Sequence, residues 1–280
     1  MNGQASRLIQ LKKLAEIERG TSITKTISVC SGKGGTGKTF FAANFAFQLS
    51  KLNKRILLID LDLNFSNLNV MMNKASENSI SNFFEQRCTL KELIFNFSKN
   101  LDLIFGDSGR LDYPRISDDI IDYFFISLNK MKNEYDYIIF DSAAGADELL
   151  IHQLLKSQYI IIVTSPEPTA VMDAYVILKL LNENFNESEK LIVVNKCYEH
   201  EEGERTIGNI STASRHFLGQ EINKLGFISF DNIVHKSIVD QELLLNFNPL
   251  SLVAQEILEL SKRFLKIEHL ANNNQPKLSV

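Results

Sequence analysis

GKGGTGKT, residues 32–39, is the stretch of sequence that decides the fold. It satisfies the pattern G-x-x-x-x-G-K-[ST], follows the β-branched run TISVCS and precedes the helical run TFFAANFAFQLSKL, which is the context of a phosphate-binding loop. The glycines let successive backbone N–H groups point at phosphate oxygens, and the helix N-terminus adds positive potential. We therefore predict that the loop binds a nucleoside triphosphate through Gly32, Lys33, Gly34, Gly35, Thr36, Gly37, Lys38, Thr39 and Phe40.

Specific side chains of the loop and of two strand ends suit a magnesium nucleotide. Lys38 is expected to lie against the β- and γ-phosphates, and the Thr39 hydroxyl to ligate Mg²⁺. Asp60 and Asp62 end the run LLIDLD, and Asp141 ends the run IIFD. Since ligands of open α/β sheets lie outside the carboxyl ends of the strands, these aspartates are predicted to meet at the phosphates.

Short apolar runs alternate with longer helical patterns along the chain. Most of the runs are continuously apolar, which is typical of strands covered on both faces. The alternation predicts an α/β fold with a doubly wound, mostly parallel sheet flanked by helices, the fold of P-loop NTPases. The predicted strands are 26–30, 55–60, 101–105, 135–141, 159–164, 191–195 and 226–230, and the predicted helices are 38–52, about 79–97, 117–131, 147–157, 168–183, 205–224 and 250–269. We expect one domain over residues 22–270, preceded by a leader (1–21) and followed by a polar, disordered tail (271–280).

Composition narrows the classes of function. The net charge of −4 argues against a surface that neutralises many phosphates of a nucleic acid, so no specific nucleic acid is expected as a partner. The three cysteines are widely spaced, which argues against a metal cluster and indicates a reducing compartment. The amino terminus lacks the apolar core of a signal peptide and no apolar run is long enough to span a bilayer, so we expect a cytoplasmic protein.

Taken together, SGKGGTGKT, IDLDLNFSNLN and DSAAG resemble the MinD/ParA family of deviant-Walker ATPases. The resemblance implies ATP as ligand, a slow Mg²⁺-dependent ATPase stimulated by a partner, and an ATP-dependent homodimer in which Lys33 contacts the partner's nucleotide. It also implies that Asp62 positions the attacking water, that Thr39, Asp60 and Asp141 hold Mg²⁺, and that Asn195 contacts adenine. Asn64 stands where the family usually has glycine, and asparagine tolerates the left-handed conformation better than most residues.

Two further segments resemble one branch of that family, the flagellar-number regulators FlhG (also called YlxH). VTSPEPTAVMDAYVILKLL (163–181) is similar to the branch's segment after the fifth strand. GQASRLIQL near the amino terminus resembles the motif D-Q-A-x-x-L-R, through which the branch engages the signal-recognition-type GTPase FlhF; Gln4, Ala5 and Leu8 fit, whereas Gly3 and Ile9 depart. The branch implies regulation of flagellar number and placement, with flagellar switch-complex proteins as further partners. An amphipathic leader without a partner is the alternative interpretation of the same residues.

The last helix and the biological output leave alternatives open. The polar side of residues 251–270 mixes acidic and basic residues, which favours a helix packed on the core over the reversible contact with the inner face of the cell membrane that the family implies. A cell-division or chromosome/plasmid-partition ATPase of the same family is the main alternative function. A P-loop metabolic kinase or ligase, with a small-molecule acceptor, is a third.

Overall fold

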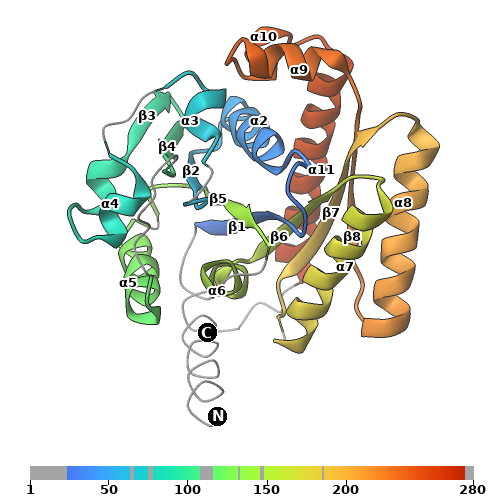
Figure 1. The fold of residues 1–280 in the computed structure, drawn as a ribbon, viewed down its shortest axis with the longest axis horizontal. Coiled ribbons are helices and arrows are strands. Elements are labelled where there is room, and N and C mark those ends of the chain that lie inside the picture. The colour runs from blue at the N-terminus through green and yellow to red at the C-terminus, as the bar shows by residue number, and fades with distance from the viewer. Residues whose placement is uncertain are drawn as a thin grey trace.

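An eight-stranded sheet forms the centre of the part of the chain that the structure describes (Figure 1). Its strand order is β3-β4-β2-β5-β1-β6-β7-β8, and all neighbours are parallel except β3 and β4. The predicted fold class, a doubly wound and mostly parallel sheet flanked by helices, is therefore confirmed. The strands are β1 (Lys25–Ser31), β2 (Ile56–Asp60), β3 (Phe95–Ser98), β4 (Leu101–Ile104), β5 (Tyr137–Ala144), β6 (Tyr159–Thr164), β7 (Glu189–Cys197) and β8 (Asn223–Ser229).

The computed structural model describes residues 24–274 apart from 64–65, 75–77, 108–115, 132, 146–147 and 185. Asn64 and the leader residues Gln4, Ala5 and Leu8 lie outside the described residues, as do residues 275–280 of the predicted tail.

Helices cover both faces of the sheet because its strands are apolar on both sides. One face packs against α2 (Lys38–Lys51) and α11 (Leu252–Asn274), which lie next to each other in Figure 1. The opposite face packs against helices in two clusters, one around α4 and α5 and one around α6, α7 and α8. The remaining bounds are α3 (Leu68–Met71), α4 (Ile80–Phe84), η1 (Leu90–Leu93), α5 (Asp118–Asn129), α6 (Glu148–Lys156), α7 (Pro168–Glu183), α8 (His200–Ala213), η2 (Ser214–Leu218), α9 (Asn232–Val239) and α10 (Leu244–Phe247).

The helix predicted over about 79–97 is wrong. The segment forms three elements, α4, the 3₁₀ turn η1 and the edge strand β3. Helix α4 ends at Phe84 because Gln86 adopts a left-handed backbone with φ 59°. Thr89 and Glu92 then form a capping box that begins η1, and the alternating run FNFS pairs antiparallel with β4.

The helix predicted over 205–224 is misplaced at both ends. Helix α8 begins at His200 and continues into the π-helical turn η2, which ends at Leu218 with Gly219 in the left-handed conformation. Residues 223–224 already belong to β8. Helices α9 and α10 were not predicted, and α11 continues to Asn274, into the segment predicted as a tail.

Helix α11 packs on the core, as the mixed charge of its polar side predicts. Ile257, Leu260 and Phe264 are buried, and Glu268 accepts hydrogen bonds from Lys25 Nζ (2.5 Å) and the Tyr137 hydroxyl (2.6 Å). The apolar side of the helix is thus occupied by the sheet. Within the described residues, no helix has the length and apolar character needed to cross a membrane.

Phe264 is expected to contribute more to stability than any exposed residue of α11. Its ring is fully buried and meets Phe45, Tyr137 and Tyr159 edge-on, with ring centroids 5.4, 5.7 and 5.2 Å away. Phe264→Ala should lower the free energy of unfolding by about 3–5 kcal/mol, because it removes buried surface and leaves a cavity. Urea denaturation measures this, and Leu270→Ala, at a position 52% exposed on the same helix, is the control expected within about 0.5 kcal/mol of wild type. Equal effects of the two substitutions would contradict the packing of α11.

Candidate functional site

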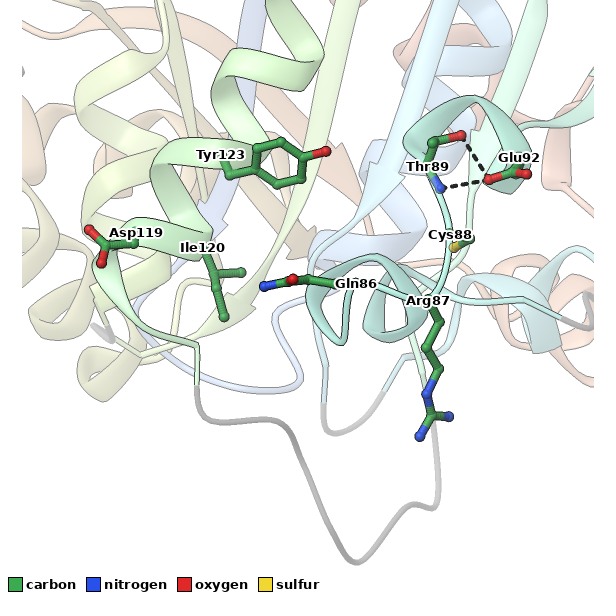
Figure 2. Close-up of a pocket in the computed structure, with 8 residues that line it drawn as sticks. All are labelled: Gln86, Arg87, Cys88, Thr89, Glu92, Asp119, Ile120 and Tyr123. Atoms are coloured by element: carbon green, nitrogen blue, oxygen red, sulfur yellow. Dashed lines mark hydrogen bonds between the residues drawn. The ribbon is translucent and has the colours of Figure 1, made fainter.

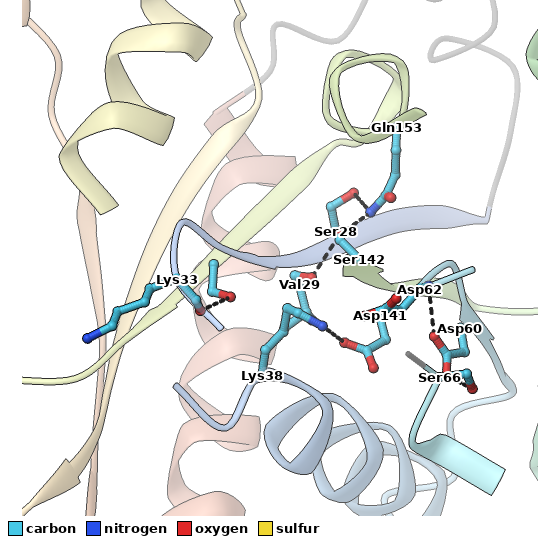
Figure 3. A network of polar contacts seen from close by, with 11 residues as sticks. Ser28, Val29, Lys33, Lys38, Asp60, Asp62, Ser66, Asp141, Ser142 and Gln153 are labelled. Atoms are coloured by element: carbon cyan, nitrogen blue, oxygen red, sulfur yellow. Dashed lines mark hydrogen bonds and ion pairs between the residues drawn. The ribbon is translucent and has the colours of Figure 1, made fainter. Parts of the chain in front are cut away.

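Lys38 lies at the first position of α2 and forms a buried ion pair. Its Nζ donates to Asp141 Oδ1 at 2.8 Å, and the side chains are 8% and 0% exposed (Figure 3). Burial acts to lower the pKa of the Lys38 ammonium, but the carboxylates of Asp141, Asp60 and Asp62 together outweigh it, and the pKa is raised. The loop lysine is therefore held as a cation between the predicted carboxylates.

Asp60 and Asp141 lie side by side on two neighbouring strands, because Asp60 of β2 pairs in register with Asp141 of β5. Asp60 is fully buried: its Oδ1 accepts from the backbone N–H of Asp62 (2.9 Å) and its Oδ2 from the Ser66 hydroxyl (2.6 Å). Burial, followed by the charge of Asp141, raises the pKa of Asp60 to about 7. A cation at this position would favour the ionised form of Asp60.

The protein oxygen atoms at this site are too few to enclose a cation by themselves, but they suit a Mg²⁺ ion that is also bound by phosphates and water. Asp141 Oδ2 is buried without a hydrogen-bond partner, so it is available for a ligand bond. Thr39 follows Lys38 in the first turn of α2. Within the described residues, no group of three or more His, Cys, Asp or Glu side chains is arranged so that it could hold a metal ion by itself. Mg²⁺ usually takes one or two carboxylates and completes its shell with phosphates and water, so the predicted set Thr39, Asp60 and Asp141 fits a magnesium nucleotide.

Asp62 lies just past the buried end of β2. Its side chain is partly buried, and its charge is among those that raise the pKa of Lys38. The loop after β4 packs closely on this segment: a Cβ on Gly106 would lie 2.8 Å from the Asp62 carbonyl oxygen and 3.0 Å from Asp60 Cγ. The loop can therefore pack this closely against the aspartate segment only because residue 106 has no side chain. Sequence reasoning did not select Gly106 or Ser66.

Lys33 points away from the Lys38–Asp141 pair (Figure 3). Its Nζ donates to Glu167 Oε2 (2.8 Å) and Thr169 Oγ1 (2.9 Å), at the N-terminus of α7. The Lys33 and Glu167 side chains are 40% and 65% exposed, and the hydrogen bond from Lys33 lowers the pKa of Glu167. Glu167 and Thr169 belong to residues 163–181, the segment that resembles the flagellar-number regulators.

Asn195, predicted to contact adenine, is buried at the end of β7 and donates from Nδ2 to the Thr36 carbonyl oxygen at 2.8 Å. The adenine contact stays a prediction, and it would have to use the amide's second N–H or its oxygen. Phe40 is also buried in the core, so its backbone alone is available to a phosphate.

A buried polar network lies beneath Asp141, and no sequence pattern revealed it. The Gln153 side chain, from α6, donates to the hydroxyls of Ser28 (3.0 Å) and Ser142 (2.6 Å), and Ser142 donates to the Val29 carbonyl (2.8 Å) (Figure 3). Ser142 directly follows Asp141, so the network fixes β5 against β1 at the site.

A separate pocket of about 570 Å³ lies between the α4–η1 turn and α5 (Figure 2). Thr89 and Glu92, hydrogen-bonded to each other, line it together with Cys88 and Tyr123. It contains none of the predicted site residues.

Comparisons with known proteins identify several proteins to which this chain is similar. The chain matches the family model described as AAA domain over residues 24–193. Flagellum site-determining protein YlxH of Helicobacter pylori is 29% identical over 262 residues, 92% of this chain and 88% of that protein. Antiactivator FleN of Pseudomonas aeruginosa is 25% identical over 217 residues, 78% of each chain. Septum site-determining protein MinD of Bacillus subtilis is 30% identical over 219 residues, 76% of this chain and 79% of that protein.

A solved structure shares the fold. Septum site-determining protein MinD from Pyrococcus horikoshii, complexed with Mg-ADP, superposes with a TM-score of 0.72 at 20% identity, covering 88% of this chain and 98% of that one.

Proposed function

This chain belongs to the MinD/ParA-type ATPases of the AAA domain family, and from that premise we propose that it is an ATP-driven dimerising switch that regulates flagellar number and placement. The observation that carries the switch is the opposite direction of the two loop lysines. Lys38 points inward to Asp141, whereas Lys33 points outward to α7. The similarity to flagellum site-determining protein YlxH over 92% of this chain supports the flagellar role.

In the proposed cycle, each loop lysine serves a different nucleotide. Lys38 lies against the β- and γ-phosphates of its own ATP, while Lys33 reaches the triphosphate of the partner subunit and offsets charge there, as an arginine finger does. Thr39, Asp60 and Asp141 would hold Mg²⁺, which neutralises phosphate charge when bound. Asp62 orients the water whose oxygen bonds to the γ-phosphorus as the bond to the ADP oxygen breaks, and the proton that this water loses passes to the released phosphate. Hydrolysis separates the dimer.

A division or partition role is the second candidate, and the 30% identity to a septum site-determining protein favours it. Partition ATPases would have to bind DNA, which the net charge of −4 disfavours. A gel shift at low salt separates the partition role from the flagellar one: retarded DNA in the presence of ATP supports partition and contradicts the flagellar assignment.

Partner choice tests the flagellar role. We propose that the leader engages an FlhF-type GTPase through Gln4, Ala5 and Leu8, and that partner binding stimulates hydrolysis. In a pull-down from flagellated cells, the full chain should recover this GTPase, whereas a chain beginning at residue 22 should recover at least tenfold less. The Gln4→Ala/Leu8→Ala double variant of the full chain controls for the loss of other leader residues. Equal recovery with and without the leader, or recovery of division proteins instead, would contradict the assignment.

A further inference from the structure

Two side chains at the end of β7 hold successive carbonyl groups of the phosphate loop. Asn195 Nδ2 donates to the Thr36 carbonyl at 2.8 Å, and Lys196 Nζ donates to the Gly35 carbonyl at 2.7 Å. Each of these side chains lies about 160 positions after its loop partner in the sequence. These two hydrogen bonds thus connect the phosphate loop to the end of β7.

The backbone that carries these side chains is itself locked in an uncommon shape. Lys196 has φ 63°, in the left-handed region that residues other than glycine seldom adopt. Its N–H donates to Asn195 Oδ1 at 2.9 Å, so the amide of Asn195 fastens the turn with its oxygen and the loop with its nitrogen. Such a conformation persists only where its surroundings enforce it, which indicates a role for this turn.

The loop is shaped to receive the amide. Gly37 has φ 87°, and a Cβ there would lie 2.2 Å from Asn195 Nδ2. Asn195 is only 5% exposed, so it fills the space that the missing side chain leaves. Any other residue at position 37 would expel the amide.

These contacts determine the direction of the loop's N–H groups. A trans peptide is planar, and its C=O and N–H point in opposite directions. Because the carbonyls of Gly35 and Thr36 are drawn toward β7, the N–H groups of Thr36 and Gly37 are turned to the opposite side of the loop. Donors that are oriented before the anion arrives bind it without reorganisation.

We propose that Asn195 and Lys196 form a clamp that holds the phosphate loop in its anion-binding shape, so that both residues act on the triphosphate whatever base it carries. They are positioning residues, which act through the loop. The proposal rests on nucleotide binding at residues 32–39, and it is independent of dimerisation and of the flagellar role.

Ligand affinity tests the clamp against a role in reading the base. Lys196→Ala and Asn195→Ala should each weaken binding of ATP and of inorganic triphosphate, both with Mg²⁺, and each variant should lose affinity for the two ligands by the same factor. That factor should be about ten, the net value of one hydrogen bond between protein groups. Calorimetry measures both affinities. Lys179→Ala, which removes an exposed lysine of α7, is the control expected to bind both ligands like wild type. A loss confined to ATP would identify a base contact and overturn the clamp.

A measurement on the ligand-free protein tests the same idea without any nucleotide. Amide hydrogen exchange in a peptide spanning residues 31–41 should be at least tenfold faster in Lys196→Ala than in wild type, and Lys196→Arg should restore slow exchange. Lys196 is exposed, so this variant should fold even if Asn195→Ala does not. Unchanged exchange and unchanged triphosphate affinity in Lys196→Ala would overturn the clamp alone. A wild-type protein that binds neither ligand would overturn the proposed function and the clamp together.

Discussion

Lys33→Ala is expected to slow ATP hydrolysis by about a thousandfold and to abolish the ATP-dependent dimer, because a cation supplied to a neighbouring triphosphate contributes about 10³–10⁵ to the rate. ATP binding by the single chain should persist, since Lys33 points away from Lys38 and Asp141. Light scattering of the protein with ATP and with ADP measures the dimer, and phosphate release measures hydrolysis. Wild type should be dimeric only with ATP.

Glu167→Gln is the matched control for this prediction. The structure shows Lys33 paired with Glu167 of its own chain, and that pair must open before Lys33 can reach a second subunit. The Lys33 side chain is partly exposed and the Glu167 side chain largely exposed, and ion pairs that water reaches contribute little to stability, so opening this pair should cost little. Glu167→Gln should therefore dimerise and hydrolyse ATP as wild type does. A Lys33→Ala protein that still dimerises with ATP would contradict the assignment of Lys33 to the partner's nucleotide.

The centre of the site was predictable because its signals are local. The loop pattern between a strand and a helix identifies residues 32–39, and a carboxylate that ends a buried strand is recognisable from four apolar residues before it. In a parallel sheet such carboxylates gather at one edge, and the register that places Asp60 opposite Asp141 follows from the fold.

The parts that sequence reasoning missed depend on contacts between distant residues. Lys33 and Glu167 are 134 positions apart, and Asn195 and Thr36 are 159 apart, so no pattern in either segment indicates its partner. Gly106 could not be predicted for the same reason: only the packing of the aspartate segment against position 106 requires glycine there. The edge strand β3 is a miss of another kind, because its signals are local. The capping box at Thr89 and the alternation of FNFS are both visible in the sequence, and they indicate a turn and a strand where one long helix is predicted.

Asp62→Ala is expected to separate hydrolysis from dimerisation. If Asp62 orients the attacking water, its loss should slow hydrolysis by about 10²–10⁴-fold and leave an ATP dimer that outlasts that of wild type. The geometry supports a role distinct from that of Asp60. Asp60 is fully buried with both carboxylate oxygens engaged, whereas Asp62 is partly buried and close enough to Lys38 to raise its pKa. Phosphate release and the dissociation rate of the dimer after dilution measure the two effects.

Asp60→Asn gives the contrast that makes this result specific. An amide in place of Asp60 removes one of the two buried carboxylates that would hold Mg²⁺, so this variant should lose Mg²⁺-dependent ATP binding and, with it, the dimer. Asp62→Ala should keep both. If the Asp62 variant instead lost ATP binding to the same degree as Asp60→Asn, the two aspartates would share one role as ligands of the magnesium nucleotide. The slow step of the switch would then have to be assigned to a group other than Asp62.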